Sequence, residues 1–243
     1  MNCRIFSDQI ENVLEQIPQK QAQAFRDYFQ NAPESVLSAM SLEKRNADRI
    51  LVEEHEPIEK VFILLSGTVR AIDYRVKGSA YEHARFSGVA NLGSMECMFG
   101  IATYTTTLVT VTACTFATMP RQVFENWIWQ DIGALRAEAT RMRGYLLEHT
   151  RENRIMLLLS GKERLIYLLV KLCQSKGAAE HYLLSVNRQE LAERTGSSVK
   201  TVNRSMKALE EEGYIRREGH KVKITQNQYS SMKDYLELIS NTD

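Results

Sequence analysis

Cysteine is scarce in this chain, and the four cysteines stand far apart. Cys3, Cys97, Cys114 and Cys173 form no CxxC pair, and no histidine cluster lies beside them. The sequence therefore has no zinc-ligand spacing and no dithiol redox motif, and we expect no metal site. Redox sensing through Cys97 or Cys114 stays open, but buried and inert thiols are the commoner arrangement.

Long hydrophobic runs and a strong net charge are also missing. No stretch approaches the length of a membrane span, and the first residues lack the basic and apolar regions of a signal peptide, so we expect a cytoplasmic protein with no membrane partner. The formal net charge of the 243 residues is only +1. Residues 160–243 carry 14 Lys or Arg against 11 Asp or Glu, and the remainder carries 17 against 19. A surface for nucleic acid must therefore be local.

The sequence contains no arrangement that is typical of an enzyme. It has no nucleophile beside a base, no phosphate-binding loop and no metal spacing. We expect no catalytic residue and no cofactor, although an unknown small-molecule effector remains open.

The first half of the chain changes its pattern near residue 36. Apolar residues recur at helical spacing over 7–30, with Pro18 between two segments. From about 36 to 120, short runs rich in Val, Ile, Thr and Tyr are broken by Gly, which predicts an antiparallel sandwich or barrel. In "LLSGTV", Gly67 is expected to supply the turn between two strands.

After Pro120 the strand pattern ends and nearly 40 residues follow without proline. Apolar residues recur there at alternating spacings of four and three, which predicts one long helix with a heptad seam. A helix packed only on its own barrel is the alternative to a helix that meets a second copy of itself. The predicted dimer seam consists of Ile128, Ile132, Leu135, Met142 and Leu146.

The stretch "NRQELAERTGSSVKTVNRSMKALEEEGYI" predicts two short helices joined by a turn. Asn187 is expected to cap the first helix with Glu190 as its capping-box partner. Gly196 ends that helix, and Ser197 is expected to cap the second.

The second of these helices has two different faces. Val202, Met206 and Leu209 are spaced for burial, and a basic stripe of Lys200, Arg204 and Lys207 lies opposite. The runs in "GYIRREGHKVKIT" predict a hairpin wing whose cations, Arg216, Arg217, Lys221 and Lys223, could reach phosphates. Together these features predict a winged helix-turn-helix that binds double-stranded DNA. The alternatives are a solvated basic face and a sensor that uses the winged helix to dock on another protein.

These motifs resemble those of the cyclic-AMP receptor protein and FNR (CRP/FNR) family of transcription regulators. The shared pattern is R-Q-E-(I/L)-(A/G) followed by G-x-(S/T)-x-x-T-V-x-R and L-x-x-x-G-x-I. The resemblance implies an α+β fold with an N-terminal double-stranded β-helix, or β-roll, over 1–120. A long dimerisation helix over 121–159 and a C-terminal winged helix-turn-helix over 160–243 would follow. It further implies a homodimeric, sequence-specific regulator, more often an activator, with RNA polymerase as a partner.

The resemblance also assigns the residues that would contact DNA. Arg188 and Gln189 match positions that contact backbone phosphate, and the three base-reading positions carry Val199, Lys200 and Arg204. The full set expected at DNA is Arg188, Gln189, Ser197, Ser198, Val199, Lys200, Thr201, Arg204, Lys207 and Arg216.

The ligand positions of the family are altered. Its cyclic-nucleotide members hold the ribose with a Glu and the phosphate with an Arg followed by Ser or Thr, where this chain has Ser94, Tyr104 and Thr105. A buried phosphate needs a cation or several donors, so we expect an effector other than cyclic AMP. The expected effector pocket consists of Gly93, Ser94, Tyr104, Thr105, His149 and Thr150, the last two by analogy with positions that contact adenine.

Two other sensing modes of the family also lack their ligands. Cys3 alone stands where an iron–sulfur cluster needs several thiolates. For haem, His83 is a loose candidate, and an exposed strand histidine is the commoner explanation. The tail "QNQYSSMKDYLELISNTD" predicts a further helix whose packing partner the sequence leaves open.

Overall fold

The computed structural model describes residues 6–75, 79–219 and 221–240, with side chains except at 75, 79, 148–155 and 240. The chain divides into two compact units. The first consists of Met1–Asp73 and His83–His149, and the second of Tyr74–Glu82 and Thr150–Asp243. The domain boundaries after residues 120 and 159 stay predictions.

Two amphipathic helices begin the first unit, as their spacing predicted. They are α1 (Asp8–Gln16) and α2 (Gln19–Tyr28), and the short α3 (Glu34–Ser38) follows. Pro18 separates α1 from α2 because its fixed φ favours the start of a helix and excludes the interior. Phe25 and Phe29 are buried, and the ring of Phe29 stacks on Trp127 at 5.0 Å. This aromatic contact ties the two helices to the rest of the unit.

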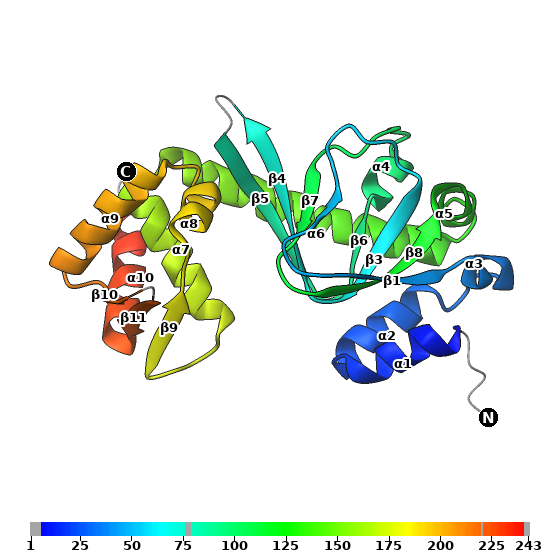
Figure 1. Ribbon diagram of the computed structural model, residues 1–243, viewed down its shortest axis with the longest axis horizontal. Coiled ribbons are helices and arrows are strands. Elements are labelled where there is room, and N and C mark those ends of the chain that lie inside the picture. Colours follow the sequence, from blue (N-terminus) through cyan, green and yellow to red (C-terminus); the bar gives the residue numbers. More distant parts are fainter. Residues whose placement is uncertain (1–5, 76–78, 220, 241–243) are drawn as a thin grey trace. The chain divides into compact units, whose positions relative to one another are not determined.

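Among the described residues, eight strands form two antiparallel sheets around a common apolar core (Figure 1). One sheet has the order β1-β8-β3-β6 and the other the order β2-β7-β4-β5. The predicted sandwich or barrel is therefore confirmed. The strands are β1 (Ser41–Arg45), β2 (Ile50–Val52), β3 (Lys60–Ser66), β4 (Thr68–Arg75), β5 (Ser79–Ser87), β6 (Ala90–Leu92), β7 (Thr107–Thr110) and β8 (Cys114–Pro120). The helix α4 (Ser94–Met98) follows β6.

Gly67 joins strands that belong to different sheets. It lies between β3 and β4 with φ at +98°, a region that residues with a Cβ rarely adopt. A Cβ on Gly67 would lie 2.5 Å from the carbonyl oxygen of Ala113 and 2.6 Å from Sγ of Cys114. The turn that "LLSGTV" predicted is present, and it serves as the corner between the two sheets.

The long helix predicted over 121–159 is interrupted. It consists of α5 (Arg121–Ile128) and α6 (Ile132–Leu158). Asp131 explains the break, because its Oδ1 accepts a hydrogen bond from the amide of Ala134 at 3.0 Å, as an N-cap does. Its Oδ2 accepts from the indole of Trp127 at 3.3 Å. The heptad spacing of the apolar residues continues across the interruption, so the sequence pattern predicted one continuous helix.

The two faces of α6 differ in burial. Ala134 and Glu138 face the core of the first unit, whereas Ile132 is 72% exposed and Leu146 is 52% exposed. Ile128 ends α5 and is fully buried in the core. Its assignment to the dimer seam was therefore wrong, because a side chain without exposed surface cannot contact a second copy.

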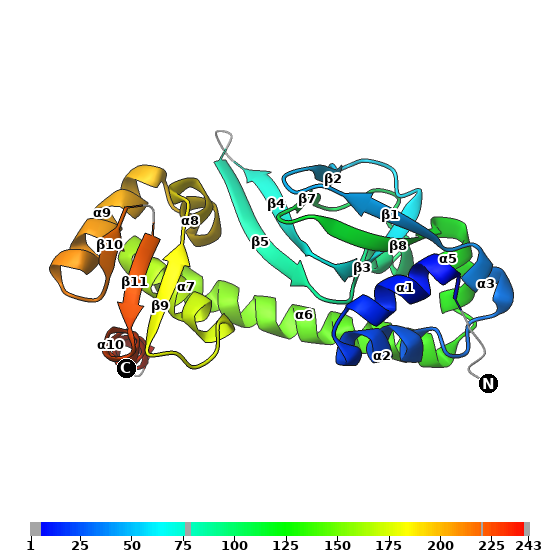
Figure 2. The ribbon, with the colours of Figure 1, turned by 60° about the horizontal axis from the view of Figure 1, so that its bottom comes forward.

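The second unit contains helices around a three-stranded antiparallel sheet, β10-β11-β9 (Figure 2). The helices are α7 (Gly161–Ser175), α8 (Arg188–Thr195), α9 (Val199–Glu211) and α10 (Gln226–Ser240). The strands are β9 (His181–Ser185), β10 (Arg216–Glu218) and β11 (Lys221–Thr225). Strands β10 and β11 pair as the predicted wing. The tail helix α10 contacts α7 and β11 and buries Met232 completely.

We expect Gly67→Ala to destabilise the first unit by about 2–4 kcal/mol, since it combines an unfavourable φ with a steric clash. Gly100→Ala is the matched control, because Gly100 has φ at +68° and no atom within 4 Å of the added Cβ. It should cost about 1–2 kcal/mol. Both tryptophans, Trp127 and Trp129, belong to the first unit, so urea unfolding followed by tryptophan fluorescence measures this difference. Equal losses would contradict the close approach at Gly67.

Candidate nucleic-acid interface and ligand cavity

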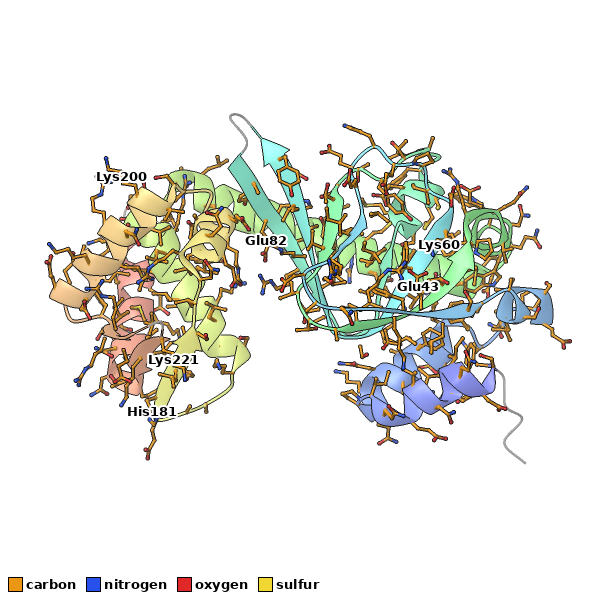
Figure 3. All side chains as sticks on the ribbon, in the orientation of Figure 1. Glu43, Lys60, Glu82, His181, Lys200 and Lys221 are labelled. Atoms are coloured by element: carbon orange, nitrogen blue, oxygen red, sulfur yellow. The ribbon has the colours of Figure 1, made fainter. Side chains whose placement is uncertain are left out.

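Helix α9 has one buried face and one exposed basic face. Val202, Met206 and Leu209 belong to the core of the second unit, as predicted. On the other side, Lys200, Arg204 and Lys207 are exposed, and Lys200 projects outward from the helix (Figure 3). Three cations spaced by four and three residues therefore form one stripe along the helix.

The turn before α9 fixes how this helix begins. Gly196 ends α8 in the left-handed region, with φ at +59°. The amide of Ser197 then donates to the carbonyl of Ala192 at 3.0 Å, so Ser197 still belongs to the end of α8. Ser198 is the N-cap of α9, because its Oγ accepts from the amide of Thr201 at 3.1 Å. The prediction that Ser197 caps α9 was therefore wrong by one residue.

The start of α8 holds a partly buried cation. Asn187 caps the helix by accepting from the amide of Gln189 at 2.8 Å, whereas the predicted capping box required a bond from Glu190. Arg188 is half-buried, and its Nη1 is buried without a hydrogen-bond partner among the described residues. Desolvation and the nearby charge of Arg217 lower the pKa of Arg188. An anion beside the exposed part of Arg188 would offset the repulsion from Arg217.

The remaining predicted residues lie around these helix ends. The side-chain amide of Gln189 donates to Glu193 at 3.0 Å, and the hydroxyls of Ser198 and Thr201 lie 3.0 Å apart. Val199 is partly buried against the core of the second unit. Lys207 is 3.6 Å from Glu211 in an exposed pair, which contributes little to stability.

On the wing, two neighbouring arginines have different roles. Arg216 is exposed in β10, opposite Lys223 of β11. Arg217 forms an ion pair with Glu210 of α9, and its amide donates to Glu210 at 2.9 Å. Arg217 therefore fastens the wing to α9. The expectation that it reaches phosphate stays a prediction, and phosphate would have to compete with Glu210 for its guanidinium.

The first turn of α7 contacts both ends of α9. A Cβ on Gly161 would lie 2.8 Å from Cγ2 of Thr201, near the start of α9. Lys162 bonds both carboxylate oxygens of Glu212, the C-cap of α9, at 2.9 Å. Arg164 also donates to the carbonyl of Thr195, the last residue of α8, at 3.4 Å. The beginning of α7 therefore holds the helix-turn-helix in one orientation.

A cavity of about 400 Å³ opens in the first unit. Strands β4–β7, α4 and the part of α6 in that unit supply its walls. Four of the residues expected in the effector pocket line this cavity, namely Gly93, Ser94, Tyr104 and Thr105. The side chains of His149 and Thr150, which were also expected there, lie outside the described residues.

A carboxylate from α6 enters this cavity. Glu138 is 3% exposed and accepts hydrogen bonds from the hydroxyl of Ser94 and from Nδ2 of Asn91, the latter at 2.7 Å. Arg141 lies 3.2 Å from the same carboxylate and 4.3 Å from the centre of the Tyr28 ring. Sequence reasoning missed Glu138. Its only signal was the helical spacing that it shares with Ala134, Arg141 and Tyr145.

The two remaining nucleotide positions are also engaged within the chain. The hydroxyl of Tyr104 donates to the carbonyl of Lys60 at 2.7 Å, and burial raises the pKa of Tyr104 well above its usual value. The hydroxyl of Thr105 donates to Oε1 of Glu96 at 2.7 Å. Ser94, Tyr104 and Thr105 therefore bond to the protein itself and add no positive charge to the cavity.

Two family models match the chain, and together they extend over the β-roll and the helix-turn-helix. The cyclic nucleotide-binding domain matches residues 42–131, and the Crp-like helix-turn-helix domain matches residues 163–229. The CRP-like cAMP-activated global transcriptional regulator of Mycobacterium tuberculosis is 24% identical over an aligned length of 209 residues, and the match covers 82% of this chain and 92% of that protein. The chain belongs to the CRP/FNR family of transcription regulators.

Solved structures of other regulators share the fold. The c-di-GMP responsive global regulator CLP of Xanthomonas campestris matches with a TM-score of 0.72 at 19% identity, over 86% of this chain and 99% of that chain. A CRP/FNR-family regulator of Thermus thermophilus matches with a TM-score of 0.66 at 20% identity, over 81% and 98%. The predicted α+β fold, a β-roll followed by a C-terminal helix-turn-helix, is confirmed. Among the described helices, none is long and apolar enough to cross a membrane.

The three described cysteines of this CRP/FNR regulator, Cys97, Cys114 and Cys173, are buried, as expected for Cys97 and Cys114. Burial raises the pKa of Cys97 to about 12 and that of Cys173 to about 11, and it also raises the pKa of Cys114. His83 was expected to be an exposed strand histidine, which was wrong. It is half-buried and lines the cavity, 3.0 Å from Oγ1 of Thr106 and 3.3 Å from Oδ1 of Asp73.

Ser94→Ala should destabilise the first unit of this CRP/FNR regulator by about 1–3 kcal/mol, because a buried carboxylate loses a donor. The control is Ser38→Ala, whose exposed hydroxyl reaches only the carbonyl of Ser35 at 3.4 Å. Urea unfolding of both variants, followed by tryptophan fluorescence, measures the difference. If Ser94→Ala is no less stable than Ser38→Ala, the bond to Glu138 does not hold α6 on the β-roll.

Proposed function

We propose that this regulator acts as a homodimer in which each copy places α9 in the major groove of one operator half-site. The separation of the two faces of α9 carries the proposal, because the core fixes one face and leaves Lys200, Arg204 and Lys207 on the other. The two half-sites would lie about 34 Å apart, which is one turn of DNA. By family analogy, RNA polymerase would be a further partner.

Base reading and phosphate binding would fall to different residues. Arg204 suits guanine, because its guanidinium can bond O6 and N7 together, and Lys200 suits the acceptors O6 of guanine or O4 of thymine. Arg188 and Arg216 would bind phosphates, because Arg188 lies at the start of α8 and Arg216 is exposed on the wing. This division lets a chain with a net charge of +1 bind a polyanion.

The exposed apolar residues of α6 support the homodimer. Ile132 and Leu146 are both more than half exposed, and Leu135 is partly buried against the core of the first unit. A helix surface of this kind is typical of a seam with a second helix. With Ile128 excluded, the proposed seam consists of Ile132, Leu135, Met142 and Leu146.

We assign the cavity in the β-roll as the effector site. Met142 supports the assignment, because it lines the cavity and also stands in the proposed seam. A ligand that displaced Met142 would change how two copies pack, and thereby the spacing of their α9 helices. Cyclic AMP does not suit the cavity, because its phosphate would find no cation at Ser94, Tyr104 or Thr105.

Arg204→Ala is expected to relax sequence preference at one base pair in each half-site, with a loss of roughly 1–3 kcal/mol of discrimination. Arg216→Ala is the matched control on the wing. It should weaken binding to all sequences alike and reduce the slope of log affinity against log salt by about 1. Selection of binding sites from random DNA, followed by titrations at several salt concentrations, separates the two effects.

Either of two outcomes would contradict the assignment of α9. Arg204→Ala could leave the selected sequence unchanged, or Arg216→Ala could change it as strongly. A protein-docking role for the winged helix would instead give no salt-dependent DNA binding by the unmodified protein.

Leu146→Glu should give a monomer that binds its operator poorly, because the substitution places a charge in an apolar contact between subunits. Leu238→Glu on α10 is the control, since Leu238 is equally apolar, more exposed and outside the seam. Sedimentation velocity measures the oligomeric state. A Leu146→Glu protein that sediments as an intact dimer would show that α6 is not the seam.

A further inference from the structure

The part of the cavity where cyclic-nucleotide members hold their ligand already contains two carboxylates of the chain. The hydroxyl of Ser94 bonds Glu138, and that of Thr105 bonds Glu96. Hydroxyls that could donate to a ligand anion therefore donate to internal anions. A negatively charged ligand would have to displace these bonds and then lie beside two negative charges.

The two carboxylates differ in how well they are compensated. Among the described residues, Glu138 has an arginine and two further donors, whereas Glu96 accepts only from the hydroxyl and amide of Thr105, at 2.7 and 3.4 Å. Glu96 is 6% exposed and lines the cavity. Among the described side chains, no cation lies within ion-pair distance of it. A buried carboxylate without a cation is costly, and a ligand that supplies positive charge would remove that cost.

The cations near the cavity serve other partners. Arg141 pairs with Glu138, Arg85 is engaged in a contact within the chain, and His83 lies beside Asp73. The field of Glu96 reaches the phenols that line the cavity. Burial is the largest cause of the raised pKa values of Tyr104 and Tyr145, and the charge of Glu96 contributes to both. The buried Oδ1 of Asn91 adds an acceptor without a partner among the described residues.

The cavity also has an aromatic wall. The rings of Phe86 and Tyr145 lie 6.1 Å apart between centroids and are nearly parallel, at 18°. Both line the cavity, together with Val89 and Leu108. Aromatic faces attract cations, and an apolar wall favours a ligand with a hydrophobic body.

We propose that the cavity of the β-roll binds a small organic cation, an amine with an apolar or aromatic body, whose ammonium group pairs with Glu96. This inference rests on the proposed role of the cavity as the effector site. It names the charge that the effector carries, which is opposite to that of a cyclic nucleotide.

Three probes of similar size test the charge preference on the full-length protein without DNA. Phenethylamine, 2-phenylethanol and phenylacetate share a phenyl ring and carry a cation, a neutral hydroxyl and an anion, respectively. Isothermal calorimetry should show the amine binding roughly 10- to 100-fold more tightly than the alcohol, as expected for a charge-assisted bond to a buried carboxylate. Phenylacetate should bind most weakly of the three.

Variants of Glu96 then test which residue sets the preference. Glu96→Gln should abolish the advantage of the amine over the alcohol, and Glu96→Asp should keep most of it. Glu15→Gln, an exposed substitution on α1, should bind like the unchanged protein. Thermal unfolding without ligand shows whether each variant is folded.

The inference is wrong if phenylacetate or cyclic AMP binds more tightly than the amine, or if the amine keeps its advantage in Glu96→Gln. It is equally wrong if none of the three probes binds at millimolar concentration. Operator selection by the same protein preparation reports separately on the proposed function. Operator binding without amine binding would overturn only the ligand class.

Discussion

The contact of Glu138 with Ser94, Asn91 and Arg141 determines how the β-roll and α6 are joined. A buried carboxylate is tolerated only where donors surround it, and these donors come from β6, α4 and α6 itself. The contact therefore fixes the helix against the turn at Gly93 and occupies the cavity with an internal anion. The outward face of α6 is a consequence, because rotating the helix to bury Ile132 would remove Glu138 from its donors.

In the second unit, negative charges are placed beside positive ones at the end of α9. Three glutamates lie at the end of the helix, and each forms an ion pair. Glu210 pairs with Arg217 of the wing, Glu211 with Lys207, and Glu212 with Lys162 of α7. Two of these pairs hold neighbouring elements against the end of α9. The acidic end thus compensates the supporting cations, while Lys200 and Arg204 near the start of the helix keep their charge directed at solvent. This arrangement explains how a nearly neutral chain presents a basic surface.

Local patterns predicted most of the fold, and contacts between distant residues account for what they missed. The spacing of Val202, Met206 and Leu209 was sufficient because a helix repeats every 3.6 residues whatever surrounds it. The interruption before α6 was missed, because the apolar heptad spacing continues through the residues where α5 ends and Asp131 caps α6. Glu138 was missed for a different reason: its burial depends on donors 44 and 47 residues away in the sequence. The spacing of neighbouring residues in the sequence does not predict a contact between residues so far apart.

The cavity keeps the backbone shape of the family but not its ligand contacts, because backbone and side chains obey different constraints. The corner at Gly67 and the left-handed turn at Gly93 depend on main-chain dihedrals, so they survive as long as glycine stands there. A ligand contact depends on one side-chain group, and the same backbone accommodates Ser94 turned toward a carboxylate of its own chain. The β-roll can therefore keep its shape while the charge of its interior is reversed. For this reason, the residues that line the cavity are a better guide to the ligand than the fold that encloses it.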